Sequence, residues 1–295
     1  DSCVADHTLA LVLASVRQLD YYGAQLRAGV WRTTLPLPAG ITGKRLGVLG
    51  LGTIGRKIAL RAQAFEMEVG YHNRSPKADA PWTYFDSLLA LAEWADVLVV
   101  ATPGGAGTLH LVDATVMRAL GPQGHLVNIA RGSVVDTQAL ATALRSGELG
   151  FAALDVYESE PCTDSPLFGM PNVLCTPHLG ASTEEAQMNV ALEAVSLLVD
   201  FFTTGEIKQS VNMSPLDAKT LEGLRSHLNV AYRLGLLLSQ LGHKQPNRCE
   251  LFYRGEVAAK DTRLLSSAFA AGLLENAVEE GANIINAGFL LEERG

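Results

Sequence analysis

Short uninterrupted apolar runs alternate with helix-like stretches through the middle of the chain, and this pattern limits the possible folds more than any other feature. The apolar runs occupy residues 46–50, 68–71, 97–101, 125–129, 151–156 and 172–176. Helical periodicity fills most of the intervals, as at 54–65 and at 136–146, where Asp136 is a capping residue and Gly147 follows the last turn. Continuous apolar strands separated by helices predict a parallel sheet covered on both faces, which is an α/β fold.

A glycine-rich turn follows the first apolar run and opens the first of these helices. It reads Gly50-Leu51-Gly52-Thr53-Ile54-Gly55. Glycines at this spacing allow a tight turn and close approach of the backbone to a pyrophosphate, while the helix N-terminus offers N–H groups to the phosphates. Because strand, glycines and helix come in the required order, we expect a dinucleotide site on a doubly wound Rossmann sheet. The alternative is a glycine-rich structural turn.

The residues after the second apolar run bear on which dinucleotide is bound. Chains that prefer NAD place an acidic residue there, which binds the ribose 2′-hydroxyl. This chain has Asn73 instead, followed by Arg74 and Ser75. Asparagine removes the charge that would repel a 2′-phosphate, and the guanidinium and hydroxyl groups can bind one. We therefore expect NADP to be preferred over NAD; the alternative is a permissive site that accepts both.

Three side chains suited to 2-oxo acid chemistry come just after later apolar runs. They are Arg131, Glu160 and His178. Ligands of an open parallel sheet bind at this carboxyl edge of the strands. A substrate carboxylate needs a bidentate cation, and the carbonyl oxygen needs a proton donor that titrates near neutrality and has a carboxylate partner. Each residue alone could be structural, but together they make up the set that reduction of a 2-oxo acid requires.

Four stretches of the chain resemble the D-isomer-specific 2-hydroxyacid dehydrogenases. They are GLGTIGRKIA at 50–59, NIARGSVVD at 128–136, ALDVYESEP at 153–161 and TPHLGAST at 176–183. The resemblance extends over residues 1–210 and implies hydride transfer between a nicotinamide cofactor and a small 2-hydroxy or 2-oxo acid. It implies that His178 is the general acid and base, that Glu160 is its partner, and that Arg131 anchors the substrate.

The same resemblance assigns further residues to the cofactor. Asp155 falls where the family holds the nicotinamide carboxamide. The remaining family cofactor contacts fall on Gly50, Gly52, Thr53, Ile54, Gly55, Thr102, Pro103, Ala130 and Gly180. Asp6 and His7 are expected at the surface or in a dimer interface, and we assign them no chemistry.

Different parts of the chain resemble different branches of this family. HNRSPK at 72–77 and ATPGGAGTLHLVD at 101–113 resemble NADPH-dependent glyoxylate/hydroxypyruvate reductases. The chain from 177 onward resembles phosphoglycerate dehydrogenases, notably at 211–213, 253–256, 261–263, 286–287 and 292–295. We favour oxidation of 3-phosphoglycerate to 3-phosphohydroxypyruvate in L-serine biosynthesis. The alternatives are NADPH-dependent glyoxylate/hydroxypyruvate reduction and a non-enzymatic nucleotide-sensing scaffold, against which the complete catalytic set weighs.

The pattern changes after Pro177, which suggests a division into domains. Ser182-Thr183-Glu184-Glu185 has the form of a capping box, and a helix should run from it to about Phe202. The expected parts are a cofactor-binding domain at 1–181, a helix returning to a substrate domain at 182–210, and part of a smaller α+β domain at 211–295 with a strand at 250–253. The resemblance implies that most of the substrate domain precedes residue 1 and that the smaller domain continues beyond residue 295.

Composition and charge bear on partners and location. The apolar share of 48% and the charged share of 18% are typical of a soluble globular protein, and a net charge of -8 without a basic run argues against nucleic acid or an anionic membrane as partner. The four cysteines lack metal-ligand spacing and are interpreted as free thiols, so the cytoplasm is the default location. The family resemblance implies that a helix at 5–27 packs across a two-fold axis, and its apolar stripe fits that use, so we expect a homodimer or a higher homo-oligomer.

Overall fold

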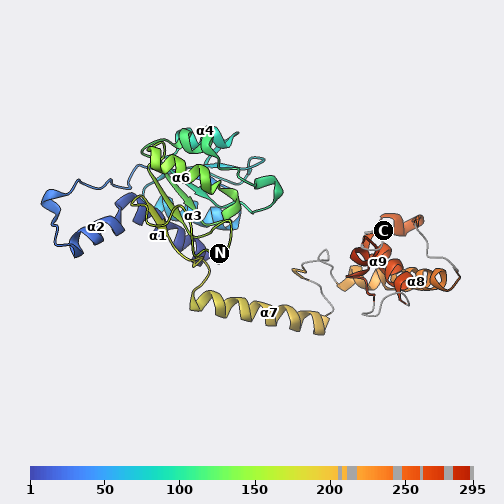
Figure 1. The fold of residues 1–295 in the computed structure, drawn as a ribbon. Coiled ribbons are helices and arrows are strands. Elements are labelled where there is room, and N and C mark those ends of the chain that lie inside the picture. The colour runs from blue at the N-terminus through green and yellow to red at the C-terminus, as the bar shows by residue number, and fades with distance from the viewer. Residues whose placement is uncertain (205–207, 211–217, 242–247, 260–261, 276–281, 293–295) are drawn as a thin grey trace. The chain divides into compact units, whose positions relative to one another are not determined.

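The computed structural model describes residues 1–204, 208–210, 218–241, 248–259, 262–275 and 282–292. The chain separates into two compact units, Asp1–Asn189 and Val190–Gly295. The first unit contains the sheet, and the second contains the helical segments near the C-terminus (Figure 1).

The first unit is built on one seven-stranded parallel sheet. Its strands are β1 Arg45–Leu49, β2 Glu68–His72, β3 Thr83–Phe85, β4 Val97–Val100, β5 His125–Asn128, β6 Phe151–Leu154 and β7 Val173–Cys175. The spatial order is β3-β2-β1-β4-β5-β6-β7, so the direction of winding reverses between β1 and β4. The predicted doubly wound Rossmann arrangement is thereby confirmed, and all six expected apolar runs form strands within two residues of their expected bounds.

The sequence pattern missed one strand, β3. It has three residues and pairs only with β2, where Thr83 lies opposite Gly70 and Phe85 opposite His72. A segment of three partly buried residues at the edge of a sheet is too short to show a hydrophobic period.

Helices cover both faces of the sheet (Figure 1). One face carries α1 Ser2–Arg17 and α3 Thr53–Ala64, and the other carries α4 Leu88–Trp94, α5 Ala114–Leu120 and α6 Thr137–Ser146. Short 3-10 helices lie at Arg32–Thr34, Ala106–Thr108, Gly132–Val134 and Gly255–Ala259.

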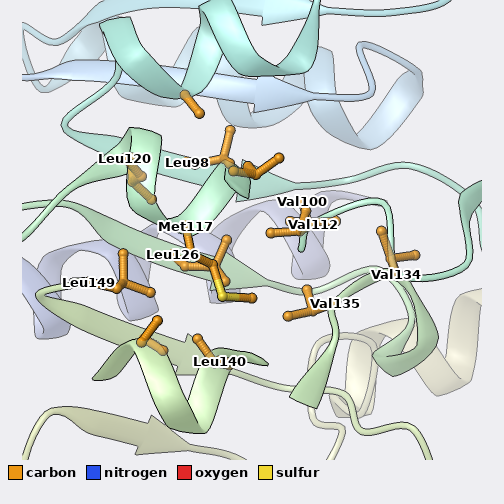
Figure 2. Packing of buried hydrophobic residues seen from close by; sticks show 14 of the residues in the cluster. Leu98, Val100, Val112, Met117, Leu120, Leu126, Val134, Val135, Leu140 and Leu149 are labelled. Atoms are coloured by element: carbon orange, nitrogen blue, oxygen red, sulfur yellow. The ribbon is translucent and has the colours of Figure 1, made fainter. Parts of the chain in front are cut away.

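The central strands are buried on both sides, as the continuous apolar runs predict. Along β4, Val97 and Val99 pack with α1 and α3, whereas Leu98 and Val100 pack with the opposite helices. This alternation follows from the two-residue period of a strand. Figure 2 shows the second of these cores, in which Leu98, Val100 and Leu126 from the strands meet Met117, Leu120 and Leu140 from the helices.

The N-terminal helical segment is broken, which corrects the expectation of one helix over 5–27. α1 ends at Arg17, Gln18 adopts a left-handed conformation with φ 49°, and α2 Leu19–Arg27 follows. Of the apolar stripe, Leu9 and Val16 are buried against the chain's own sheet, while Leu19 is 58% exposed. Leu9 and Val16 are therefore used within the unit, and the packing of this segment across a two-fold axis stays a prediction.

Two helix starts test the capping predictions. At α6, Asp136 accepts hydrogen bonds from two N–H groups of the first turn, as predicted. At α7 Glu184–Thr204, Thr183 takes the capping position, because its Oγ1 accepts from the N–H three residues later at 3.1 Å. Ser182 instead donates to the carbonyl of His178. Thr183 rather than Ser182 is therefore the N-cap, and the expected capping box is not formed, because the third residue after Thr183 is Ala186.

The second unit is described mainly by α8 Ala218–Leu241, α9 Arg263–Leu274 and α10 Ala287–Glu292. α8 and α9 touch backbone to backbone: a Cβ on Gly235 would collide with the carbonyl oxygen of Phe269, and a Cβ on Gly272 with that of Tyr232. Within the described parts of the chain, no helix combines the length and hydropathy that crossing a membrane requires.

The strand expected at 250–253 is not formed, since residues 248–254 belong to neither helix nor strand. In the described residues of this unit there is no strand with which it could pair, and an isolated strand leaves its backbone hydrogen bonds unmade. Of the motifs noted in this part of the sequence, residues 211–213, 261 and 293–295 lie outside the described residues.

Candidate active site

The predicted cofactor and substrate residues all follow the carboxyl ends of strands. The glycine turn follows β1, Asn73, Arg74 and Ser75 follow β2, Thr102 and Pro103 follow β4, Ala130 and Arg131 follow β5, Asp155 and Glu160 follow β6, and His178 and Gly180 follow β7. Because the strands are parallel, these ends share one edge of the sheet. The glycine turn lies where the winding reverses, which is where sheets of this type bind their ligands.

The glycine turn has room for a phosphate group at the start of α3. Gly50 has φ 101°, and a Cβ there would lie 2.8 Å from the backbone of Ala101, while a Cβ on Gly55 would collide with the carbonyl oxygen of Gly50. A Cβ on Gly52 would meet nothing within 4 Å, and no side chain caps the helix that begins at Thr53. The first-turn N–H groups therefore face open space without a side-chain acceptor, a geometry that fits a pyrophosphate.

Asn73 is attached to this turn rather than free at the surface. Its Oδ1 accepts a hydrogen bond from the Leu51 N–H at 2.7 Å. Since that oxygen is engaged, the amide N–H₂ is the group that Asn73 can offer to a ligand. Arg74 and Ser75 are exposed beside it. The loop thus offers an amide donor, a hydroxyl group and a guanidinium.

His178 and Glu160 form the central couple of the site. His178 Nδ1 lies 2.7 Å from Glu160 Oε2, and Glu160 Oε1 accepts from the Tyr157 N–H at 2.9 Å. Burial works to raise the pKa of Glu160, but the hydrogen bonds from Tyr157 and His178, together with the charge of Arg131, outweigh it and hold that pKa below its ordinary value. Glu160 is therefore ionised at neutral pH.

This couple fixes the roles of the two imidazole nitrogens. An ionised carboxylate can only accept, so Nδ1 of His178 is the donor and Nε2 is left for a substrate. His178 has a left-handed backbone, with φ 56°, which costs roughly 1–3 kcal/mol in a non-glycine residue and persists only where neighbours hold it. A cavity of about 570 Å³ opens beside the couple and is also lined by Tyr157, Cys162 and Phe168.

The loop that carries Arg131 is braced by Asn128, whose role the sequence analysis missed. Asn128 is 1% exposed; its Oδ1 accepts from the Ala130 N–H and its Nδ2 donates to the Arg131 carbonyl, each at 3.1 Å. A buried amide that bonds at both ends of its side chain holds the turn in one shape. The sequence does carry a signal for Asn128, because it is a polar residue at the end of an apolar run.

Gly132 lets this loop touch the loop that carries Glu160. A Cβ on Gly132 would collide with the backbone of Tyr157 and Glu158. The two loops are therefore in direct backbone contact, and the charge of the exposed Arg131 reaches Glu160.

Asp155 is a buried carboxylate that holds the loop of His178. Its Oδ1 accepts from the Thr176 hydroxyl at 2.6 Å and from the Leu179 N–H at 2.8 Å, and its Oδ2 accepts from the Gly180 N–H at 2.8 Å. The residue is 1% exposed. Oδ2 keeps acceptor capacity for one more donor, which is compatible with a carboxamide.

The structure brings His7 into the site, which corrects its assignment to the surface or a dimer interface. Its Nε2 lies 3.1 Å from Thr176 Oγ1 and 3.2 Å from Asp155 Oδ1. Asp6 lies at the surface, as expected, and pairs with Arg61 at 2.6 Å. No local pattern marks His7, because only the packing of α1 on β5 and β6 carries it to the strand ends.

Comparison with protein-family models agrees with this geometry. Residues 9–180 match the model described as D-isomer specific 2-hydroxyacid dehydrogenase, NAD binding domain. Residues 223–295 match the D-3-phosphoglycerate dehydrogenase intervening domain. The second match confirms the resemblance predicted for the C-terminal part of the chain.

Individual relatives come from both predicted branches. The D-3-phosphoglycerate dehydrogenase of Mycobacterium leprae is 37% identical over an alignment of 298 positions, which covers 99% of this chain and 55% of that protein. A glyoxylate/hydroxypyruvate reductase A of Arabidopsis thaliana is 43% identical over 189 residues, which is 64% of this chain and 60% of that protein. This chain thus spans about half the length of the phosphoglycerate dehydrogenase that it matches.

Solved structures give the same fold. The NADPH-dependent glyoxylate/hydroxypyruvate reductase of Sinorhizobium meliloti, crystallised with NADP and malonate, superposes with a TM-score of 0.66 at 38% identity, over 74% of this chain and 67% of that one. The order of the strands, the glycine turn at the point of reversal and the match over residues 9–180 agree with one another. The chain belongs to the D-isomer-specific 2-hydroxyacid dehydrogenases.

Proposed function

We propose that this chain supplies the cofactor-binding and catalytic residues of a dehydrogenase that oxidises 3-phosphoglycerate to 3-phosphohydroxypyruvate in L-serine biosynthesis. The observation that carries the proposal is the 2.7 Å contact between His178 and Glu160 at the same sheet edge as the glycine turn. Hydride transfer to or from a hydroxy acid needs such a proton-transfer couple beside the dinucleotide. Similarity to a phosphoglycerate dehydrogenase along 99% of the chain supports this substrate.

Each catalytic residue has one task in this reaction. Arg131 binds the substrate carboxylate through its guanidinium. His178 Nε2 takes the hydroxyl proton as the hydroxy acid is oxidised and returns it in the reverse direction, while Glu160 stabilises the imidazolium at Nδ1. When bound, the nicotinamide exchanges the hydride at its C4. The contribution of the protein is to hold the substrate and His178 in line.

The residues proposed to bind the cofactor follow the same edge. Gly50, Gly52, Thr53, Ile54 and Gly55 take the pyrophosphate, Thr102, Pro103 and Ala130 flank it, and Asp155 and Gly180 take the nicotinamide end. We infer a preference for NADP, because Asn73, Arg74 and Ser75 offer donors and a cation to a 2′-phosphate. Measuring kcat/KM with NADPH and NADH tests this inference, and a clear preference for NADH would contradict it.

A spectrophotometric assay of the protein expressed from its own gene tests the reaction. It measures 3-phosphoglycerate oxidation and hydroxypyruvate reduction, each with both cofactors. Formation of phosphohydroxypyruvate supports the proposal. His178→Asn removes the proton-transfer group, so kcat should fall by several orders of magnitude with little change in the Kd of the cofactor. Unchanged turnover would exclude His178 from this role.

The second candidate is NADPH-dependent glyoxylate/hydroxypyruvate reduction. It is favoured by the donors after β2 and by the 43% identity with the Arabidopsis reductase. Rapid hydroxypyruvate reduction with NADPH, without any phosphoglycerate oxidation, would identify this activity instead. Such a result would mean that the cofactor half of the chain predicts the reaction and that the C-terminal half does not.

We also infer that the protein is a homodimer in the cytoplasm. The apolar residues left uncovered near the N-terminus lie on α2 and the segment after it: Leu19, Leu26, Trp31 and Leu37 are 57–94% exposed. An apolar set of this size on an exposed segment is typical of a contact surface. Sedimentation equilibrium would give the oligomeric state.

The inferred location in the cytoplasm rests on the cysteines. All four cysteines are free thiols, as in proteins of reducing compartments.

A further inference from the structure

His7 contacts two of the polar groups that hold the loop of His178, Asp155 and Thr176. It lies on α1, far from that loop in the sequence. Its side chain is 20% exposed, and Nε2 lies within 3.2 Å of both Thr176 Oγ1 and Asp155 Oδ1. A single ring nitrogen is thus shared by two oxygens that belong to the ends of β6 and β7.

The geometry determines which way the hydrogen bonds run. Thr176 has one hydroxyl proton, and its 2.6 Å contact with the Asp155 carboxylate uses that proton. Its oxygen can then only accept from His7. Asp155 Oδ1 also only accepts, so a bare Nε2 would face two acceptors at once. His7 Nε2 therefore carries the proton and donates it to Thr176 Oγ1, and the same N–H lies 3.2 Å from the negative charge of Asp155 Oδ1.

This N–H closes a network that holds the nicotinamide end of the site. The other partners of Asp155 are the Thr176 hydroxyl and the two N–H groups of the His178 loop. α1 also touches the loop through Val4, which a Cβ on Gly180 would approach at 3.6 Å. The first turns of α1 thus pack against the loop that carries His178.

We propose that His7 is a positioning residue of the dehydrogenase, acting through Asp155 to orient the acceptor that takes the nicotinamide carboxamide. This inference rests on the proposed function only in assigning the nicotinamide to Asp155. His7 touches neither the adenine end of the cofactor site nor His178. Its loss should therefore weaken the binding of the nicotinamide half of the cofactor and leave the adenosine half unaffected.

The test compares two probes on the 295-residue chain. NADPH spans the whole site, whereas adenosine 2′,5′-bisphosphate ends before the nicotinamide. His7→Leu removes the donor at similar size, and the Kd for NADPH should rise up to about tenfold, which is the range of one hydrogen bond, while the Kd for the bisphosphate stays within about twofold. His7→Gln keeps an N–H at the position of Nε2 and should restore NADPH binding to within about threefold.

Controls separate positioning from folding. Asp6→Asn breaks the neighbouring surface pair with Arg61 on the same helix and should change neither Kd. Melting temperatures of all variants are measured alongside. Equal weakening of both probes, or no weakening of NADPH, would overturn the proposal, and so would failure of glutamine to rescue binding in a variant that folds as well as the parent.

A spectroscopic measurement keeps this inference distinct from the proposed function. Long-range ¹H–¹⁵N NMR of the histidine rings reports which nitrogen of His7 is protonated. A proton on Nε2 supports the network, and an unprotonated Nε2 overturns the proposal whatever the ligands do. If the parent chain bound neither NADPH nor NADH, the proposed function would be refuted, while the NMR result would still decide whether His7 braces Asp155.

Discussion

Asp155→Asn replaces one buried acceptor atom with a donor and is the sharpest test of how the site is held together. Four donors lie within 3.2 Å of this carboxylate: the Thr176 hydroxyl, the Leu179 and Gly180 N–H groups and His7 Nε2. An asparagine can keep its oxygen at the position of Oδ1, where three of the donors converge. Its amide nitrogen then faces the Gly180 N–H, and that hydrogen bond is lost.

The magnitude follows from the number and type of these bonds. A hydrogen bond to a charged group contributes about 1.5–3 kcal/mol and a neutral one about 0.5–1.5 kcal/mol. One such bond is lost, two are weakened, and the attraction between the carboxylate and the His7 N–H is reduced. Burying a neutral amide instead of a carboxylate recovers roughly 1–3 kcal/mol of desolvation cost. The net loss is about 2–4 kcal/mol, which in a unit of this size lowers Tm by about 5–15 °C.

Thermal unfolding of the unliganded chain, followed by circular dichroism, measures this loss. Asp6→Asn is the matched control, because Asp6 is 63% exposed and its surface pair contributes little, so its Tm should stay within about 2 °C of the parent. If Asp155→Asn melted as close to the parent as the control does, the carboxylate would not be the anchor of the His178 loop. The reasoning behind the His7 network would then fail as well.

Three other perturbations give independent checks. Asn73→Asp keeps an acceptor for the Leu51 N–H but adds a negative charge and removes the N–H₂ group. The ratio of kcat/KM for NADPH to kcat/KM for NADH should therefore fall at least about tenfold, while Tm stays unchanged. An unchanged ratio would show that Asn73 does not select the cofactor. Gly132→Ala forces a Cβ into the backbone of Tyr157 and should cost about 1–3 kcal/mol of stability together with most of kcat, measured by urea unfolding and steady-state kinetics. Burial lowers the pKa of His125 in the folded chain from 6.5 to about 4, so the folded state disfavours the protonated ring. The free energy of unfolding is therefore at its full value above pH 6.5 and decreases as the pH falls towards 4. At pH 5 the loss is about 2 kcal/mol, and His125→Phe should abolish that pH dependence in urea unfolding.

The strands were predictable because each carries its own signal. The run 97–101 is apolar at every position, since β4 is covered by a core on each face. The three residues of β3 carry no such signal, and their pairing depends on β2 being in place beside them. The break at Gln18 was missed for a similar reason, because the apolar spacing continues through Leu19 although only α1 has a sheet to pack on.

The site was predictable to the extent that its residues follow strand ends in order along the chain. Arg131, Glu160 and His178 come after three successive strands of the sheet, so parallel topology alone brings them to one edge. The sequence could not reveal His7, which precedes all seven strands and reaches the edge only through the packing of α1 on β5 and β6. Asn128 differs, since a polar residue that ends an apolar run is visible in the sequence and its partners are only two and three residues away.

Two residues assigned to the cofactor also hold the backbone of the loops around it, and this double use affects how variants must be interpreted. Asn73 accepts from the Leu51 N–H of the glycine turn, and Asp155 accepts from two N–H groups of the His178 loop. A substitution at either position can therefore abolish binding by releasing a loop rather than by removing a ligand contact. The aspartate variant of Asn73 keeps the loop contact and changes only what faces the ligand, whereas the asparagine variant of Asp155 changes both. A loss of activity in the aspartate variant of Asn73 is thus direct evidence that Asn73 contacts the ligand. A loss of activity in the asparagine variant of Asp155 is such evidence only if the Tm of the unliganded chain is preserved.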